Sequence, residues 1–353
     1  MDYYKKIDGL RFLAIFCVLI QHFAWEVGKL TNAGWFGVDL FFVISGFLIT
    51  SILIRINEGS IKLNYLKFIG RRTLRIFPIY YIAVLILWFL GVSTIRENLV
   101  YFLTYTFNYA WVKYNIPQSI VHHFWSLSLE EQFYVFWPFI VLSLRSRYKI
   151  LLIVIAAIII LGFAQTFFQI IPALTPYNDV GLLTRMSSLG IGSFGAVLLT
   201  MNALPLKLFQ NKFIEYFIVV LLIISLAINQ PAFKLIILPF CSFYLVLKAA
   251  KFDFTIKPLR NFFGNKWIIY IGRLSYGIYI FHVPIDYYFT IYIFNVFWSL
   301  INFDTLGNFS FFKNYIWFFK FPFSVLLSVL FAALSFKYIE SPILKLKDKF
   351  FKY

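Results

Sequence analysis

The sequence predicts an all-α, polytopic membrane protein with about ten transmembrane helices and with both termini in the cytoplasm. First, 61% of the 353 residues are hydrophobic and only 13% are charged, whereas soluble domains carry about 25% charged residues. Second, ten apolar segments approach or reach the roughly 17–25 residues that a spanning helix needs. Third, if these segments alternate across the bilayer, most of the 32 Lys and Arg residues fall on the side of the termini, as the positive-inside rule requires.

The apolar segments follow one another along the whole chain. They are residues 8–26, 35–54, 76–93, 130–145, 149–169, 184–201, 213–229, 233–249, 267–290 and 317–340. The segment 130–145 is the weakest of these predictions, because it is short and begins with two glutamates. The long connections 94–129 and 291–316 both fall on the outer side in this topology.

The net charge of +17 follows the predicted membrane topology, so it does not indicate a nucleic-acid partner. The expected partner of this surface is the lipid bilayer. The first apolar segment contains Arg11 and lacks a small-x-small cleavage site, so we interpret it as a retained helix rather than a signal peptide. Cys17 and Cys241 both lie in apolar segments and are interpreted as small packing residues.

Ionisable side chains inside apolar segments are the main indication of function, because buried charge in a bilayer usually lines a pathway or a reaction site. Arg11 and His22 share the first segment, about 16 Å apart along a helix and on a similar face. Arg11 suits the anionic head of a long substrate, and His22 suits its reactive end. A neutral imidazole can take a proton from an attacking hydroxyl or carry an acyl group itself, and the residues leave both routes open. The structural alternative is a headgroup anchor and an interfacial histidine.

Asp39 opens the second apolar segment at the same predicted depth as His22. It could hydrogen-bond to His22 and fix its tautomer, as the aspartate of a hydrolase triad does. Alternatively, it could cap the N-terminus of its helix. Ser45 and Gly46, further along the same segment, are small enough to permit close helix packing.

Arg72 and Arg75 lie one helical turn apart at the cytoplasmic end of the third segment. Paired guanidiniums bind phosphate well, although basic residues are also common at this position by the positive-inside rule. In the ninth segment, Arg273 and His282 lie about 13 Å apart along one helix and repeat the order of Arg11 and His22. The alternative for His282 is an interhelical hydrogen bond.

Polar groups also gather where the connection 94–129 enters the fourth segment. His122, His123, Glu130 and Glu131 fall within ten residues of one another, together with several hydroxyl groups. The structural alternative is a wet loop end with a helix cap, because Ser128 and Glu131 have the spacing of a capping box. No metal-ligand spacing occurs in the sequence, so no metal is expected.

Five stretches resemble, in order, acyltransferase family 3, the integral-membrane acyltransferases that modify bacterial surface sugars. They are Asp8-Gly9-Leu10-Arg11 with His22, the run from Gly37 to Phe47, Arg71-Arg72 with Arg75 and Pro78, the run from His123 to Tyr134, and the run from Ser275 to Pro284. The closing Glu340-Ser341-Pro342 resembles the family's Glu-x-Pro ending. The resemblance therefore covers nearly the whole chain.

The resemblance implies one membrane acyltransferase domain over residues 1–353, without an appended soluble domain, in the bacterial cytoplasmic (inner) membrane. It implies transfer of an acyl group, usually acetyl, from acetyl-CoA to a hydroxyl of a cell-surface or lipid-linked glycan at the outer face. Together with the patterns above, it assigns the candidate residues to three roles. Catalysis is expected at His22, Asp39, Glu130 and Glu131. Coenzyme A is expected to bind Arg11, Arg72, Arg75 and Arg273, and the acceptor to bind His123, Trp125, Ser126, Tyr279 and His282.

A proton-coupled transporter is the alternative function, because the buried His, Asp and Glu residues could form a proton relay. Transporters often contain two related halves with broken helices at matching positions. No such halves are visible in the sequence, and the arginines suit a phosphorylated donor better.

Overall fold

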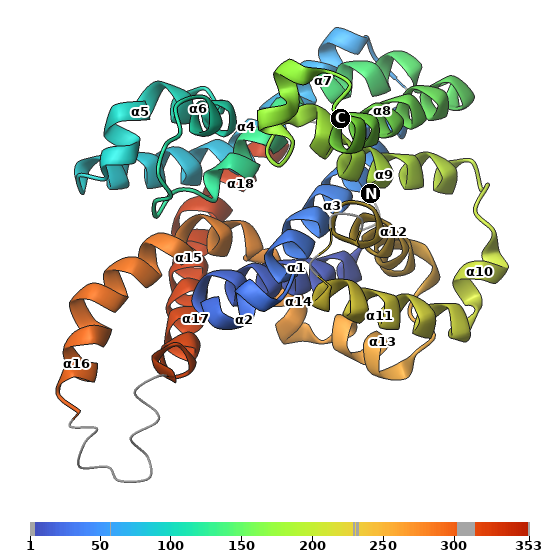
Figure 1. Ribbon diagram of the computed structural model, residues 1–353. Helices are drawn as coiled ribbons and strands as arrows, with labels where there is room; N and C mark the ends of the chain where they lie inside the picture. Colours follow the sequence, from blue (N-terminus) through green and yellow to red (C-terminus); the bar gives the residue numbers. More distant parts are fainter. Residues whose placement is uncertain (1–3, 57, 229, 231–232, 302–314, 352–353) are drawn as a thin grey trace.

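The computed structural model describes residues 4–56, 58–228, 230, 233–301 and 315–351, and Figure 1 shows them as an assembly of helices. Within these residues no β-strand occurs, and the predicted all-α membrane class is confirmed. Six of the helices are long and apolar enough to cross a membrane, or up to seven if one bent pair is a single span. The count of ten spans and the cytoplasmic termini stay predictions.

The long helices form the body of the molecule. They are α1 (Lys5–Phe23), α3 (Ala33–Ile54), α4 (Ile61–Phe89), α7 (Phe124–Leu144), α8 (Tyr148–Phe168), α9 (Leu182–Thr200), α11 (Lys212–Ala227), α15 (Ser275–Phe289) and α17 (Ile316–Ser335). The shorter α-helices are α2 (Trp25–Leu30), α5 (Ser93–Leu103), α6 (Phe107–Lys113), α10 (Leu206–Gln210), α12 (Leu238–Leu247), α13 (Lys257–Gly264), α14 (Lys266–Arg273), α16 (Asn295–Ser299) and α18 (Ser341–Phe350). Turns of 3-10 or π helix are η1 (Pro172–Tyr177), η2 (Phe233–Ile237), η3 (Lys248–Phe252), η4 (Thr290–Phe294) and η6 (Phe336–Glu340).

Both long connections differ from the sequence prediction. Residues 94–129 contain α5, α6 and the first turns of α7, which begins at Phe124 instead of residue 130. In the connection 291–316, the first residues continue as helix, and residues 302–314 lie outside the described part of the chain. The earlier start of α7 makes it 21 residues long, which is enough to cross a bilayer.

Helix α1 occupies the centre of the fold. It packs against α3, α14, α15 and α17, and it lies among them in Figure 1. A Cβ atom on Gly272 would overlap the carbonyl oxygen of Asp8, so α14 crosses α1 with the two backbones in contact. This central position surrounds Arg11 and His22 with protein rather than with lipid.

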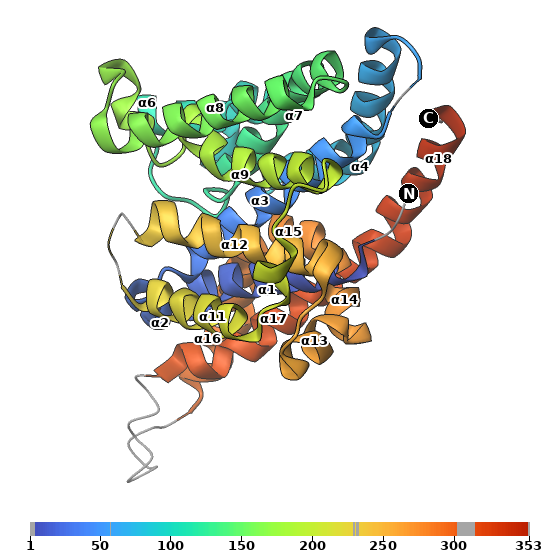
Figure 2. The same ribbon diagram turned by 90° about the vertical axis from the view of Figure 1, so that its right-hand side faces the viewer.

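Helix α3 forms the interface between the two sides of the molecule. In Figure 2, α7, α8 and α9 lie on one side of α3, and α1, α11 and α12 lie on the other. A Cβ atom on Gly46 would overlap the carbonyl of Leu189, and one on Gly192 would overlap the carbonyl of Val43. The close packing predicted for Gly46 is therefore confirmed, with α9 as its partner.

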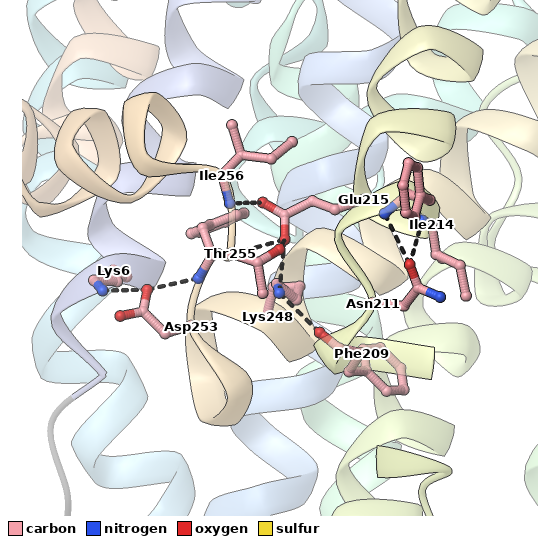
Figure 3. Close-up of polar contacts among 11 residues, drawn as sticks. Lys6, Phe209, Asn211, Ile214, Glu215, Lys248, Asp253, Thr255 and Ile256 are labelled. Atoms are coloured by element: carbon pink, nitrogen blue, oxygen red, sulfur yellow. Dashed lines mark hydrogen bonds and ion pairs between the residues drawn. The ribbon is translucent and has the colours of Figure 1, made fainter. Parts of the chain in front are cut away.

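A buried ion pair holds α11 against the π-helical turn that follows α12. Figure 3 shows Lys248 between Glu215 and the carbonyl of Phe209. The Lys248 Nζ lies 2.7 Å from Glu215 Oε2, both side chains are 0% exposed, and Nζ also donates to Phe209 O at 2.8 Å. The backbone N–H of Thr255 and of Ile256 donates to the same carboxylate. This satisfied network fixes the connection between α12 and α13.

Candidate functional site

Three cavities follow one another along α1 and share wall residues. The first, here called the arginine cavity, has a volume of about 560 Å³. The second, the middle cavity, has a volume of about 60 Å³, and Arg11, Arg75 and Tyr276 belong to the walls of both. The third, the histidine cavity, has a volume of about 380 Å³, and it shares Val38 and Tyr279 with the middle cavity. Most of the sequence-predicted residues thus lie along this series of adjoining cavities, whereas Asp39 lies outside their walls.

Arginines gather at the junction of the first two cavities, and two of them have no carboxylate within ion-pair distance among the described residues. Arg11 lies 3.7 Å from Asp8 Oδ1, and its Nε is buried without a partner. Arg72 lies over the ring of Tyr134, 5.0 Å from its centroid. Among the described residues no acidic group lies within ion-pair distance of Arg72 or Arg75. Clustered cations that lack an acidic partner favour an anionic ligand.

Arg273 also belongs to the wall of the arginine cavity, but not as the sequence suggested. The predicted span 267–290 is bent by 69° between α14 and α15, so Arg273 and His282 do not share one straight axis. The Arg273 side chain is 48% exposed and lies 3.5 Å from Asp8 Oδ2. It lies at the opposite end of the path from His282.

Glu130 and Glu131 line the middle cavity rather than the histidine cavity. The Oγ of Ser45 donates to Glu130 at 3.2 Å, and the hydroxyl of Tyr134 donates to it at 2.8 Å. Glu131 is 9% exposed, and its Oε1 has no hydrogen-bond partner within the described chain. No contact of either carboxylate with His22 occurs among the described residues, and both line the same cavity as Arg72 and Arg75 instead. The helix-cap alternative is also wrong, because α7 begins earlier and Ser128 donates to Phe124 O.

Three imidazoles meet at the histidine cavity. The ring centroid of His282 lies 4.9 Å from that of His22 and 4.7 Å from that of His123, and the centroids of His22 and His123 are 6.3 Å apart. His123 and His282 are 3% and 0% exposed. His22 lies deep in the fold, yet its side chain is open to the cavity. Among the described residues, no group of three or more His, Cys, Asp or Glu side chains has an arrangement that could hold a metal ion.

A hydroxyl pair separates the middle cavity from the histidine cavity. Ser126 Oγ and Tyr279 Oη are 2.6 Å apart, and both lie within hydrogen-bond distance of the carbonyl oxygen of His123. Ser126 lines the middle cavity, Trp125 lines the histidine cavity, and Tyr279 lines both. All five residues predicted to bind the acceptor therefore lie at or next to the histidine end of the path.

Asp39 is engaged elsewhere, and both sequence interpretations of this residue are wrong. Its Oδ1 lies 2.9 Å from Ser188 Oγ and 3.4 Å from Arg185 Nη1. It lies within α3, which begins at Ala33, so it does not cap the helix. No contact between Asp39 and His22 occurs in the described residues. The Arg185 guanidinium in turn lies 4.2 Å from the centroid of Trp35, so the pair supports the wall of the histidine cavity.

A family model described as an acyltransferase domain matches residues 4–336. The chain belongs to this acyltransferase family. The match covers the wall residues of the middle and histidine cavities and all those of the arginine cavity except Glu340 and Leu344, and the resemblance to acyltransferase family 3 is confirmed. A proton-coupled transporter is not favoured.

Curated relatives of this acyltransferase come from bacteria. The peptidoglycan O-acetyltransferase OatA of Listeria monocytogenes is 29% identical over 311 residues, which cover 80% of this chain and 49% of the relative. The O-acetyltransferase OatA of Staphylococcus aureus is 26% identical over 377 aligned residues, covering 99% of this chain and 59% of the relative. The chain thus spans about half the length of the curated relatives it matches. No solved structure matches it.

Burial keeps the imidazoles in front of α7 in their neutral form. It lowers the pKa of His122 to about 4, and His122 packs edge-on against the ring of Trp111. Burial, followed by the proximity of His282 and His22, also lowers the pKa of His123 well below its usual value. In this acyltransferase the two residues can therefore accept a proton or a hydrogen bond without adding charge at neutral pH.

Two sets of residues in this site were missed by the sequence reasoning. Trp35 and Gln118 line the histidine cavity, and Trp35 is flanked by Arg185 and Lys234. Arg185 was visible as an ionisable residue inside an apolar segment, which is a signal of function or pairing. Its partner could not be identified, because Asp39 lies 146 residues away in the sequence.

Proposed function

We propose that this acyltransferase moves an acetyl group from cytoplasmic acetyl-CoA to a hydroxyl of a glycan on the outer face of the bacterial membrane. One observation carries the proposal. A series of adjoining cavities has a cluster of guanidiniums at one end, of which Arg72 and Arg75 have no acidic partner within ion-pair distance among the described residues, and neutral imidazoles at the other end. Such a path suits a donor with a phosphorylated head and a reactive acyl end.

The donor occupies the arginine cavity and the middle cavity in this proposal. Arg11, Arg72 and Arg75 bind the phosphates of coenzyme A, because guanidiniums form paired, charge-assisted hydrogen bonds with phosphate oxygens. The pantetheine arm then extends along α1 toward His22, over the about 16 Å that separate these two positions. Arg273, half exposed at the entrance, contributes positive charge to attract the donor.

His22 serves as the general base. Its side chain opens into the histidine cavity, where it removes the proton from the acceptor hydroxyl while that oxygen attacks the thioester carbonyl carbon. A C–O bond forms, the C–S bond breaks, and the proton passes from His22 to the departing thiolate of coenzyme A. In the covalent route, a ring nitrogen of His22 attacks the thioester carbonyl carbon, the C–S bond breaks, and coenzyme A leaves as the thiol with the proton from the ring. The acceptor hydroxyl then attacks the acetyl-imidazole, the C–N bond breaks, and the hydroxyl proton returns to His22.

The acceptor class follows from the relatives and from the chemistry of the cavity walls. One relative is named a peptidoglycan O-acetyltransferase, and we assign a peptidoglycan-like glycan to this chain. Trp35, Trp111 and Trp125 line the histidine cavity with Gln118 and Ser119. Flat aromatic faces with nearby polar groups suit a sugar ring, which has an apolar face and a rim of hydroxyls.

The test uses the full chain in nanodiscs with acetyl-CoA labelled in the acetyl group, and with peptidoglycan fragments or water as acceptor. His22→Ala is expected to lower turnover by about 100-fold or more while coenzyme A still binds. Arg72→Ala is expected to raise KM for acetyl-CoA about tenfold or more, the effect of losing a charged hydrogen bond. Lys62→Ala is the matched control, because Lys62 is an exposed cation on the same helix.

Label retained on the wild-type protein would identify the covalent route, and its absence would support the general-base route. Folded wild-type protein that neither binds coenzyme A nor releases label with either acceptor would contradict the proposed function. Equal turnover by wild type and His22→Ala would contradict the role of His22.

A further inference from the structure

The hydrogen bonding of His282 defines its tautomer. Its Nδ1 lies 2.8 Å from the backbone carbonyl oxygen of Tyr279. A carbonyl oxygen can only accept, so Nδ1 carries the hydrogen and donates it. The other ring nitrogen, Nε2, is then left with a lone pair. In the described part of the protein this Nε2 is buried and has no hydrogen-bond partner.

The lone pair of His282 lies among the other imidazoles of the histidine cavity. His22 is the near neighbour that is open to the cavity, with ring centroids 4.9 Å apart and ring planes at 70°. No hydrogen bond joins the two rings in the described structure, but a centroid separation of this size allows an N–H of His22 to reach the lone pair of His282 Nε2 once the His22 ring rotates. The further titratable groups around the cavity are His122, His123, Asp179 and Tyr279.

Asp39 and Glu130, two of the carboxylates predicted to take part in catalysis, are engaged elsewhere. Asp39 is bound to Arg185 and Ser188, and Glu130 is bound to Ser45 and Tyr134 in the middle cavity. A base that must take a proton in one direction needs a partner that fixes its tautomer. Among the described residues, His123 and His282 are buried imidazoles beside His22 with a ring nitrogen that lacks a partner, and His282 is the nearer of the two, with centroids 4.9 Å from His22 against 6.3 Å for His123.

We propose that His282 is the positioning residue for His22: its Nε2 accepts a hydrogen bond from one N–H of His22, so that the other His22 nitrogen faces the acceptor hydroxyl. This inference rests on the proposed function. The hydrogen bond becomes charge-assisted when His22 takes the proton, which stabilises the imidazolium. The neutral imidazole of His282 thus orients His22 as the aspartate orients the histidine of a hydrolase triad, without adding a permanent charge inside the membrane.

Three substitutions separate this role from simple packing. His282→Gln can place its amide oxygen near the position of Nε2 and keep the acceptor. His282→Asn can keep the donor toward Tyr279 O but has no atom at the Nε2 position, and His282→Leu removes both groups. We expect kcat to fall roughly 10- to 100-fold in the Asn and Leu variants, a part of the general-base contribution. The Gln variant is expected to recover much of this loss, with KM for acetyl-CoA unchanged within about twofold.

The pH dependence of kcat/KM distinguishes a positioning role of His282 from a packing role, because a loss of packing alone does not shift it. Without the His282 acceptor, His22 takes up a proton less readily, so the acid-side half-maximum of kcat/KM shifts to lower pH in the Asn and Leu variants. The thermal midpoint and coenzyme A binding of each variant are measured to confirm that it is folded. The inference is overturned if kcat falls equally in the Gln and Asn variants. It is also overturned if the acid-side half-maximum of kcat/KM is unshifted in the Asn and Leu variants.

A measurement on the wild-type protein keeps the inference testable if the variants fail to fold. The chain contains only 4 histidines, so an NMR spectrum of protein labelled with ¹⁵N-histidine contains few imidazole signals. The tautomer of each histidine can therefore be assigned. We expect His282 as the Nδ1–H form, and an Nε2–H form overturns the inference. If His22→Ala is as active as wild type, the proposed function fails instead, whatever His282 does.

Discussion

Arg185 and Asp39 form an ion pair in the interior, with Nη1 and Oδ1 3.4 Å apart and side chains 3% and 1% exposed. The pair joins α9 to α3, and the Arg185 guanidinium also packs on Trp35 in the wall of the histidine cavity. A residue that looked like a catalytic partner of His22 in the sequence thus supports the wall of the histidine cavity.

Asp39→Ala is expected to reduce stability by about 3–5 kcal/mol, because it leaves the Arg185 charge buried without its partner. The measurement is the thermal midpoint in detergent, together with kcat per folded protein. Asp39→Asn is expected to cost less, since its amide oxygen still accepts from Ser188. The control is Asp253→Ala, because Asp253 is 45% exposed in its pair with Lys6 and such pairs contribute about 0–1 kcal/mol. Stable Asp39→Ala protein without turnover would contradict the structural role.

Gly46→Ala is expected to prevent normal packing of α3 on α9, because the new Cβ would overlap the carbonyl oxygen of Leu189. Overpacking of this kind costs about 1–3 kcal/mol or more, and backbone atoms cannot give way as a side chain can. Gly264→Ala is the matched control, since its nearest neighbour would be the end of the Lys6 side chain at 3.9 Å. Thermal midpoints that fall equally in both variants would contradict the prediction.

Lys248→Met is expected to destabilise the protein by about 3–5 kcal/mol, because it leaves the Glu215 carboxylate buried without its cation. The double variant Lys248→Met/Glu215→Leu is expected to lose less than the two single variants together. A double-mutant cycle of thermal midpoints measures this coupling. Additive losses would show that the two side chains act independently, in contrast to the network in Figure 3.

Trp111→Ala is expected to raise KM for the glycan acceptor about tenfold, which corresponds to about 1.4 kcal/mol. KM for acetyl-CoA is expected to stay unchanged, because Trp111 lines the histidine cavity and not the arginine cavity. Trp267→Ala is the control, since Trp267 is 75% exposed on the outside of the molecule. A parallel rise of both KM values would argue against an acceptor site in this cavity.

Acidification is expected to destabilise the protein through His122. Burial lowers the pKa of His122 from 6.5 to about 4, so the folded state binds fewer protons than the unfolded state between these values. The stabilisation is complete above pH 6.5 and is lost as the pH falls toward 4. His122→Gln should flatten the fall of the thermal midpoint in this window, and an unchanged slope would show that His122 does not contribute.

The sequence predicted the parts of the site that lie on single helices. Arg72 and Arg75 face one path because a single helical turn separates them, and Arg11 and His22 mark two positions on one helix. It did not predict what depends on distant contacts. Asp39 looked adjacent to His22 by depth alone, while its partner Arg185 lies on a helix far along the chain. The bend between α14 and α15 was also missed, although Gly272, Arg273 and Ser275 interrupt the apolar run at this point.

The small middle cavity has a consequence for the energy supply of the cell. A volume of about 60 Å³ holds only a few water molecules, since each needs about 10–15 Å³ of such space. A membrane protein that transfers a chemical group from one face of the bilayer to the other must not let protons leak through the same path. The membrane potential drives protons inward with about 2.3 kcal/mol per 100 mV. In the proposed function, the small volume of the middle cavity leaves no room for a continuous column of water between the two larger cavities, so acetyl groups can reach the outer face without discharging the membrane.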